Sequence, residues 1–244
     1  MYKVGVLGGM GPLATMDLCN KIIYYTDAHK DNDHIHLIID NNTEIPDRTE
    51  YILGRGEDPL KYLIKSAVTL ENMGANFIII PCNTAHYFYD NLCKFIGIPI
   101  INMIEETAKT IKDKYVGINK IILLSTEGTY KSKIYSKIFQ KYDLEIISPE
   151  AEERKYVTKL IYNIKEGVLD SNISDFKKMI NGLLRNNHVP IILGCTELPV
   201  AFERYRILDW DLIDPTKILA IKAINAAGGR VKDLNSNDLK FMKN

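Results

Sequence analysis

The sequence predicts an α/β fold in which mostly parallel sheets are covered by helices on both faces. Short apolar runs of strand length alternate with amphipathic stretches of helical period along the chain, and Gly or Pro residues separate many of them. Parallel strands need crossover connections, which helices usually supply, and such sheets are buried on both faces. A length of 244 residues suits one large domain or two small ones.

In the first part of the chain, apolar runs predict strands at residues 2–7, 36–39, 76–80 and 98–101. Pro12 stands at a favourable first helical position, so a helix is expected from there to about Asp27. Asp58 and Pro59 begin a second helix, whose apolar residues recur at helical spacing until Gly74 ends it.

The same alternation continues in the second part of the chain. Further strands are expected at residues 120–124, 145–147 and 189–193. A helix is expected to follow the strand at residues 98–101 and to end at about Lys114. Further helices are expected at residues 129–142, 157–164 and 173–185. A last helix is expected from Pro215 to the pair Gly228 and Gly229.

The charge composition excludes some classes of partner. The 31 Lys and Arg residues balance the 31 Asp and Glu residues, so the sequence carries no basic footprint for nucleic acid or for an anionic membrane. The segment at residues 1–12 is too short and too Gly-rich for a signal peptide or a membrane span. A cytoplasmic protein is therefore expected.

Two of the four cysteines lie where an α/β fold binds its ligands. In such folds the ligand lies beyond the carboxyl ends of the strands. Cys82 and Cys195 each follow an apolar strand and precede small polar residues and an expected helix, which suggests an internal duplication with one cysteine per half. Cys19 and Cys93 lie inside expected helices and are interpreted as small apolar residues. The cysteines show neither a Cys-x-x-Cys pair nor zinc spacing, so a metal site is not expected.

This placement of two cysteines suits proton transfer at carbon. The start of a helix favours a thiolate, so the pKa of each thiol is expected to fall below about 8.5. Two thiols that face each other across a cleft can act as base on one side of a carbon and acid on the other, which is what racemisation needs. Nearby donors would have to stabilise the carbanion.

Six motifs in this order resemble the aspartate/glutamate racemase superfamily, and within it the aspartate racemase branch. They lie at residues 5–12 (GVLGGMGP), 41–48 (NNTEIPDR), 81–86 (PCNTAH), 124–129 (LSTEGT), 161–167 (IYNIKEG) and 194–198 (GCTEL). The resemblance implies two pseudo-symmetric α/β/α domains with the active site in the cleft between them. The boundaries expected on this basis are residues 1–100 with 211–244 for the first domain and 101–210 for the second.

The resemblance also implies roles for individual residues. Cys82 and Cys195 match the two catalytic cysteines, and the presence of both favours racemisation by two bases. Asn83, Thr84 and Thr196 match residues that lie near the α-carboxylate or α-amino group of the substrate. Arg48 and Lys165 match basic residues that hold the distal carboxylate. Met10 and Thr126 match residues on loops that line the pocket. Glu197 departs from the glutamate racemase pattern, which tends to carry His there; it either orients Cys195 or binds the ammonium group.

Three aromatic or imidazole residues keep open interpretations. His86 lies on a helix surface or tunes Cys82, while Tyr130 and Tyr135 are expected to pack or to lie on the surface. The Gly-rich segment at residues 8–11 lacks the G-x-G-x-x-G spacing of a dinucleotide site, so a nucleotide cofactor is not expected.

The predicted function is interconversion of L- and D-aspartate without pyridoxal phosphate or any other cofactor. Three alternatives stay open: a racemase for glutamate or for several amino acids, a related lyase or decarboxylase that uses one thiol, and a non-catalytic dicarboxylate-binding protein. The resemblance further implies a homodimer.

Overall fold

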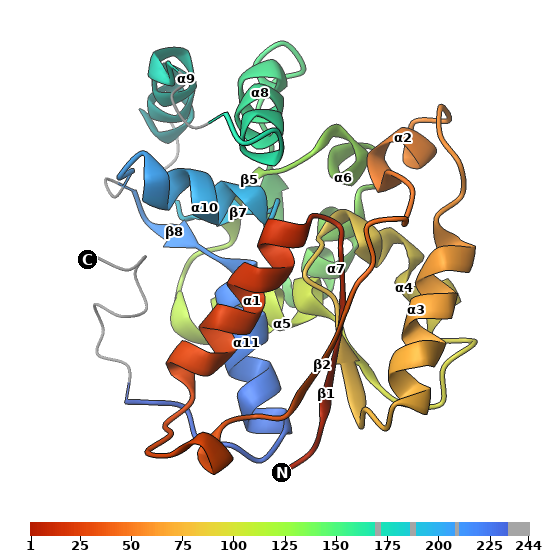
Figure 1. Cartoon of the computed structure of the whole chain (residues 1–244). Coiled ribbons are helices and arrows are strands. Elements are labelled where there is room, and N and C mark those ends of the chain that lie inside the picture. Colours follow the sequence, from red (N-terminus) through yellow and green to blue (C-terminus); the bar gives the residue numbers. More distant parts are fainter. Residues whose placement is uncertain (169–171, 186–188, 208–209, 234–244) are drawn as a thin grey trace.

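A computed structural model describes residues 1–168, 172–185, 189–207 and 210–233, which form two four-stranded sheets with helices around them (Figure 1). Every pairing between named strands is parallel. Within these ranges, no helix is long and apolar enough to cross a membrane. The predicted α/β class is confirmed.

The first sheet has the strand order β2-β1-β3-β4. Its strands are β1 (Val4–Gly8), β2 (Leu37–Asn41), β3 (Phe77–Ile79) and β4 (Ile100–Ile101). Val4 and Val6 pack on one face against α1 (Pro12–Tyr25) and α11 (Pro215–Ala226). Leu7 packs on the opposite face against α3 (Leu60–Asn72), so neighbouring residues of β1 are buried on alternate sides. Figure 1 shows α1 beside α11, with α3 on the far side of the sheet.

The second sheet repeats this order as β6-β5-β7-β8. Its strands are β5 (Lys120–Leu124), β6 (Glu145–Ile147), β7 (Ile191–Leu193) and β8 (Leu212–Ile213). The helices that cover one face are α8 (Arg154–Lys165), α9 (Ser174–Arg185) and α10 (Glu197–Arg204). The helices that cover the other face are α5 (Met103–Lys114), α6 (Glu127–Ser132) and α7 (Ile134–Phe139). The two halves are therefore built on one plan, as expected for pseudo-symmetric domains.

The chain crosses between the two sheets twice. After β4 it enters α5, which packs on the second sheet, and after β8 it enters α11, which packs on the first. Residues 212–213 are part of the second sheet because β8 pairs with β7. The domain boundaries given above stay a prediction, and residues 234–244 of the expected first domain lie outside the described residues.

Some elements differ from the sequence prediction. The helix expected at residues 129–142 is divided, because Lys133 adopts a left-handed conformation with φ of 55° between α6 and α7. The sequence did not predict α2 (Arg48–Ile52) or β8, whereas α10 is the helix expected after Cys195. Helix α2 and strand β8, with five and two residues, are too short to show a period.

Candidate active site

A small cavity between the two halves brings together all ten of the residues singled out from the sequence. The residues that line it are Met10, Arg48, Cys82, Asn83, Thr84, Thr126, Lys165, Cys195, Thr196 and Glu197, together with Asp47 and Thr49. The centre of a water molecule can occupy a volume of about 10 Å³ inside the cavity. The cavity therefore has room for roughly one water molecule. An amino acid needs more space, so side chains or the two halves must move apart when a ligand enters.

The loop after β1 forms one wall because a glycine lets it approach the loop after β2. Gly9 has φ of +89°, and a Cβ there would lie 2.1 Å from the backbone oxygen of Asn42. A side chain at this position would push the two loops apart. The close approach brings the carbonyl oxygen of Met10 to the guanidinium of Arg48, at 3.2 Å from Nη2.

Arg48 is a buried cation whose hydrogen bonds go to backbone carbonyl groups. It begins α2, where the Asp47 side chain accepts a hydrogen bond from the backbone as the N-cap. Its Nη1 donates to the carbonyl oxygens of Ile45 and Pro46 at 3.3 and 3.0 Å. Its Nε is buried without a partner, and Arg48 forms no ion pair with a carboxylate among the described residues. A buried cation with a spare donor favours an anionic ligand.

A histidine fixes the backbone of Cys82. The backbone N–H of Met103 donates to Nε2 of His86 at 3.0 Å, so Nδ1 carries the proton and donates to the carbonyl oxygen of Cys82 at 2.9 Å. Burial lowers the pKa of His86 to about 4, which keeps the ring neutral. His86 is therefore buried rather than on a helix surface, and its bond is to the carbonyl of Cys82.

Asn83 and Thr84 are bonded to side chains of the second half. The hydroxyl of Tyr135 donates to Oδ1 of Asn83 over 2.5 Å, and Nδ2 of Asn83 is buried without a partner in the described chain. Oγ1 of Thr84 lies 3.0 Å from Oγ1 of both Thr126 and Thr129. The sequence did not single out Thr129, although it belongs to one of the six motifs, and Tyr135 was expected only to pack or lie on the surface.

Cys195 and Glu197 form a buried pair at the end of β7. The Cys195 thiol donates to Oε2 of Glu197 over 2.9 Å. Burial, strengthened by the Glu197 carboxylate, raises the pKa of Cys195 well above its usual range. The expectation of a lowered pKa is therefore wrong for Cys195, because the loss of solvation and a nearby negative charge outweigh the helix start at α10.

Lys165, at the end of α8, completes the charged wall. Its Nζ lies 4.0 Å from Oε1 of Glu197. Burial acts to lower the pKa of Lys165, but the negative charges of Glu197 and Cys195 outweigh it and raise the pKa overall. Arg48 and Lys165 thus give the cavity two cations, while Glu197 is an acid that already has partners.

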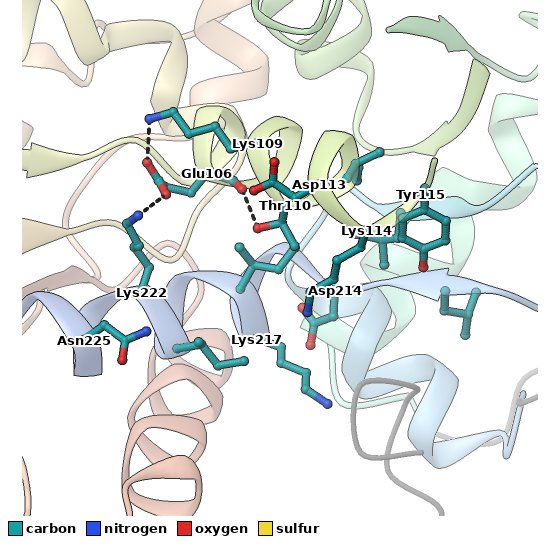
Figure 2. A pocket seen from close by; sticks show the side chains of 15 residues that line it. Glu106, Lys109, Thr110, Asp113, Lys114, Tyr115, Asp214, Lys217, Lys222 and Asn225 are labelled. Carbon is teal, nitrogen blue, oxygen red and sulfur yellow. Dashed lines mark hydrogen bonds and ion pairs between the residues drawn. The ribbon is translucent and has the colours of Figure 1, made fainter. Parts of the chain in front are cut away.

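A larger cavity lies elsewhere, between α5, β8 and α11, and has a volume of about 360 Å³ (Figure 2). None of the ten candidate residues lines it. Glu106 forms ion pairs there with Lys109 at 2.9 Å and with Lys222 at 2.8 Å. Among the described residues, no group of three or more His, Cys, Asp or Glu side chains is arranged to hold a metal ion.

Comparison with known proteins supports one family. The family model described as Asp/Glu/Hydantoin racemase matches residues 7–223. The structure of Picrophilus torridus aspartate racemase is 32% identical, covers 95% of this chain and 96% of its own, and superposes with a TM-score of 0.78. The broad specificity amino-acid racemase of Bacillus subtilis is 28% identical over 91% of this chain and 96% of its own length. Glutamate racemase of Staphylococcus carnosus is 26% identical over 66% of this chain and 64% of its own.

The matched region includes every residue that lines the small cavity and all the strands of both sheets except the first three residues of β1. This chain belongs to the Asp/Glu/Hydantoin racemase family.

Proposed function

We propose that this chain is an amino-acid racemase that interconverts L- and D-aspartate without pyridoxal phosphate, with Cys82 and Cys195 as the two proton-transferring groups. The observation that carries the proposal is that two buried thiols, one from each half, line a single cavity with two cations. Membership of the racemase family supports the reaction class.

In the proposed reaction one cysteine begins as thiolate and the other as thiol. The thiolate takes the α-proton, the electron pair stays on Cα as a carbanion, and the opposite thiol protonates Cα from the other side. The first sulfur then carries the proton and the second is the thiolate, so the reverse reaction needs no other reagent. Because its thiol donates to Glu197, Cys195 starts as the acid.

The carbanion needs donors at the α-carboxylate. The Nδ2 of Asn83 is a buried donor with no partner in the described chain, and we assign it to this carboxylate. Thr84 and Thr196 line the same cavity and carry hydroxyl groups. Fixed donors at a developing charge lower the barrier without reorganising in the transition state.

Aspartate is the proposed substrate because Arg48 and Lys165 can hold a second, distal carboxylate. An arginine fork suits a carboxylate. The 32% identity to Picrophilus torridus aspartate racemase supports this choice. The 28% identity to a broad specificity racemase favours, as the second candidate, a wider range of amino acids. A homodimer and a cytoplasmic location are also proposed; sedimentation of the purified chain tests the first.

Chiral chromatography tests the proposal directly. Purified protein incubated separately with L-aspartate, L-glutamate and L-alanine should convert aspartate fastest, to an equal mixture of enantiomers. Faster conversion of another amino acid would contradict aspartate as the preferred substrate but would still support racemisation. Binding of aspartate with no D-enantiomer formed would instead indicate a dicarboxylate-binding protein.

A further inference from the structure

One hydrogen bond joins the second half of the molecule to the candidate carboxylate donor. Tyr135 lies on α7, and its hydroxyl donates to Oδ1 of Asn83 over 2.5 Å, 52 positions away in the sequence. Both side chains are buried, with 1% and 2% of their surfaces exposed. Water is therefore largely excluded from this bond.

The bond decides which end of the Asn83 amide is left without a partner. An asparagine side chain has one oxygen that accepts and one NH₂ group that donates. Because Tyr135 occupies Oδ1, the donor Nδ2 is the end left over, and it is buried without a partner in the described part of the chain. Asn83 also lines the small cavity. A buried donor without a partner costs free energy, which a ligand oxygen would offset.

We propose that Tyr135 is a positioning residue for substrate binding: its hydroxyl fixes the Asn83 amide so that Nδ2, and not Oδ1, is presented to the α-carboxylate. The inference rests on the proposed function only in that the ligand is an amino acid. Without the hydroxyl, the amide is free to turn and present its oxygen, which repels a carboxylate.

Tyr135 remains a donor throughout the proposed reaction. Burial, together with the charge of a Cys195 thiolate, raises the pKa of Tyr135 well above its usual range. The hydroxyl therefore keeps its proton when Cys195 loses one. The orientation of Asn83 does not change as the two cysteines exchange roles.

The bond also makes the donor depend on contact between the two halves. Tyr135 packs among apolar residues of the second half, such as Leu123 of β5 and Phe139 of α7, whereas Asn83 follows β3 of the first sheet. Separation of the halves would release the amide. The orientation of Nδ2 of Asn83, the donor to the α-carboxylate, is therefore fixed when the two halves are in contact.

A double-mutant cycle tests the inference. The variants are Tyr135→Phe, Asn83→Ala and the pair together, and calorimetry measures the binding of L-aspartate and of its α-carboxamide analogue. Interconversion of enantiomers releases no net heat, and a second titration with racemic ligand shows whether turnover changes the measured affinity. Tyr25→Phe, which removes another buried tyrosine hydroxyl, is the control for folding and stability.

Tyr135→Phe should weaken aspartate binding about tenfold, the loss expected for one misdirected hydrogen bond to a charged group, and should weaken the carboxamide much less. In the Asn83→Ala background it should have no further effect, since Tyr135 acts through Asn83. An equal loss for both ligands, or the same loss in both backgrounds, would overturn the inference.

The outcomes separate this inference from the proposed reaction. Wild-type protein that binds aspartate but forms no D-aspartate would refute racemisation, and the cycle would still measure the part played by Tyr135. Wild-type protein that binds neither aspartate nor its α-carboxamide would contradict both proposals.

Discussion

The thiol of Cys195 donates a hydrogen bond to the carboxylate of Glu197, two residues further along the chain, over 2.9 Å. Cys82 is held differently, because His86 bonds to its backbone carbonyl. The two cysteines occupy equivalent places after β3 and β7 of two similar sheets, yet only Cys195 has an acid as its thiol acceptor among the described residues. The two cysteines thus have similar positions in the two sheets but different hydrogen-bond partners.

Replacing Glu197 should make Cys195 easier to ionise. In Glu197→Gln the carboxylate that adds to burial in raising the pKa of Cys195 is lost, so the pKa should fall, although burial keeps it above its usual range. Alkylation of Cys195, followed by peptide mass spectrometry from neutral to alkaline pH, should then begin at lower pH. Exposed Cys93 in the same sample is the internal control. An unchanged profile for Cys195 would show that the Glu197 charge does not act on it.

Removing either cavity cysteine should stop racemisation. Cys82→Ala and Cys195→Ala each remove one of the two groups that the proposed reaction needs, and a positioned acid or base contributes roughly 100-fold or more to the rate. Chiral chromatography of aspartate should show a loss of at least that size. Cys93→Ala, at an exposed position outside the cavity, should keep full activity. A cavity variant that is as active as the wild type would remove that cysteine from the mechanism.

Arg48 should matter most for substrates with a second carboxylate. Its buried guanidinium bonds only to carbonyl oxygens in the described structure. Arg48→Met should weaken the binding free energy of aspartate by about 1.5–3 kcal/mol, the size of one hydrogen bond to a charged group. The loss for alanine should be smaller, because alanine has no second carboxylate. The ratio of kcat/KM for the two substrates measures this. Arg55→Met, at an exposed arginine paired with Glu50, is the matched control and should leave the ratio unchanged.

Gly128 should be essential for close contact between α2 and α6. A Cβ at Gly128 would lie 2.8 Å from Cα of Thr49, which lines the cavity. Gly128→Ala should therefore hold these helices apart and lower kcat/KM, with an overpacking cost of about 1–3 kcal/mol. Gly182→Ala, in helix α9 with no atom within 4 Å of the added Cβ, should leave activity unchanged and stabilise its helix slightly. Equal activity of the two variants would refute the need for this contact.

Stability should fall in acid because His86 is buried neutral. Its pKa is lowered from 6.5 to about 4, so the unfolded chain takes up a proton before the folded chain does. The stabilisation is complete above pH 6.5 and is lost as the pH falls towards 4, amounting to about 3 kcal/mol in all.

The variant His86→Gln isolates this contribution. Urea unfolding at a series of pH values should show a weaker loss of stability in acid than the wild type, whatever its stability at neutral pH. Curves that fall in parallel would mean that other groups cause the acid sensitivity.

The sequence predicted the sheets and the position of the site because both depend on local pattern. Apolar runs and helical periods are properties of neighbouring residues, and residues that follow parallel strands meet at one edge of a sheet. For this reason the sequence alone places Cys82 and Cys195 after the ends of strands. The left-handed Lys133, which divides α6 from α7, could not, since that conformation is usual for Gly or Asn.

The rest of the site depends on packing between distant residues. Tyr135 has the helical spacing of a core residue, and nothing in its neighbourhood indicates that its hydroxyl meets Asn83. The raised pKa of Cys195 likewise comes from its depth of burial and from the direction of the Glu197 side chain, which the motif alone does not specify.

Racemisation of L-aspartate in deuterated water tests most directly whether two thiols act from opposite sides of one carbon. At early times the D-aspartate formed should carry deuterium at Cα, while the recovered L-aspartate should keep its protium, because different sulfurs remove and deliver the proton. D-aspartate that retains the original protium, or deuterium that appears equally in both enantiomers from the start, would contradict the two-thiol account.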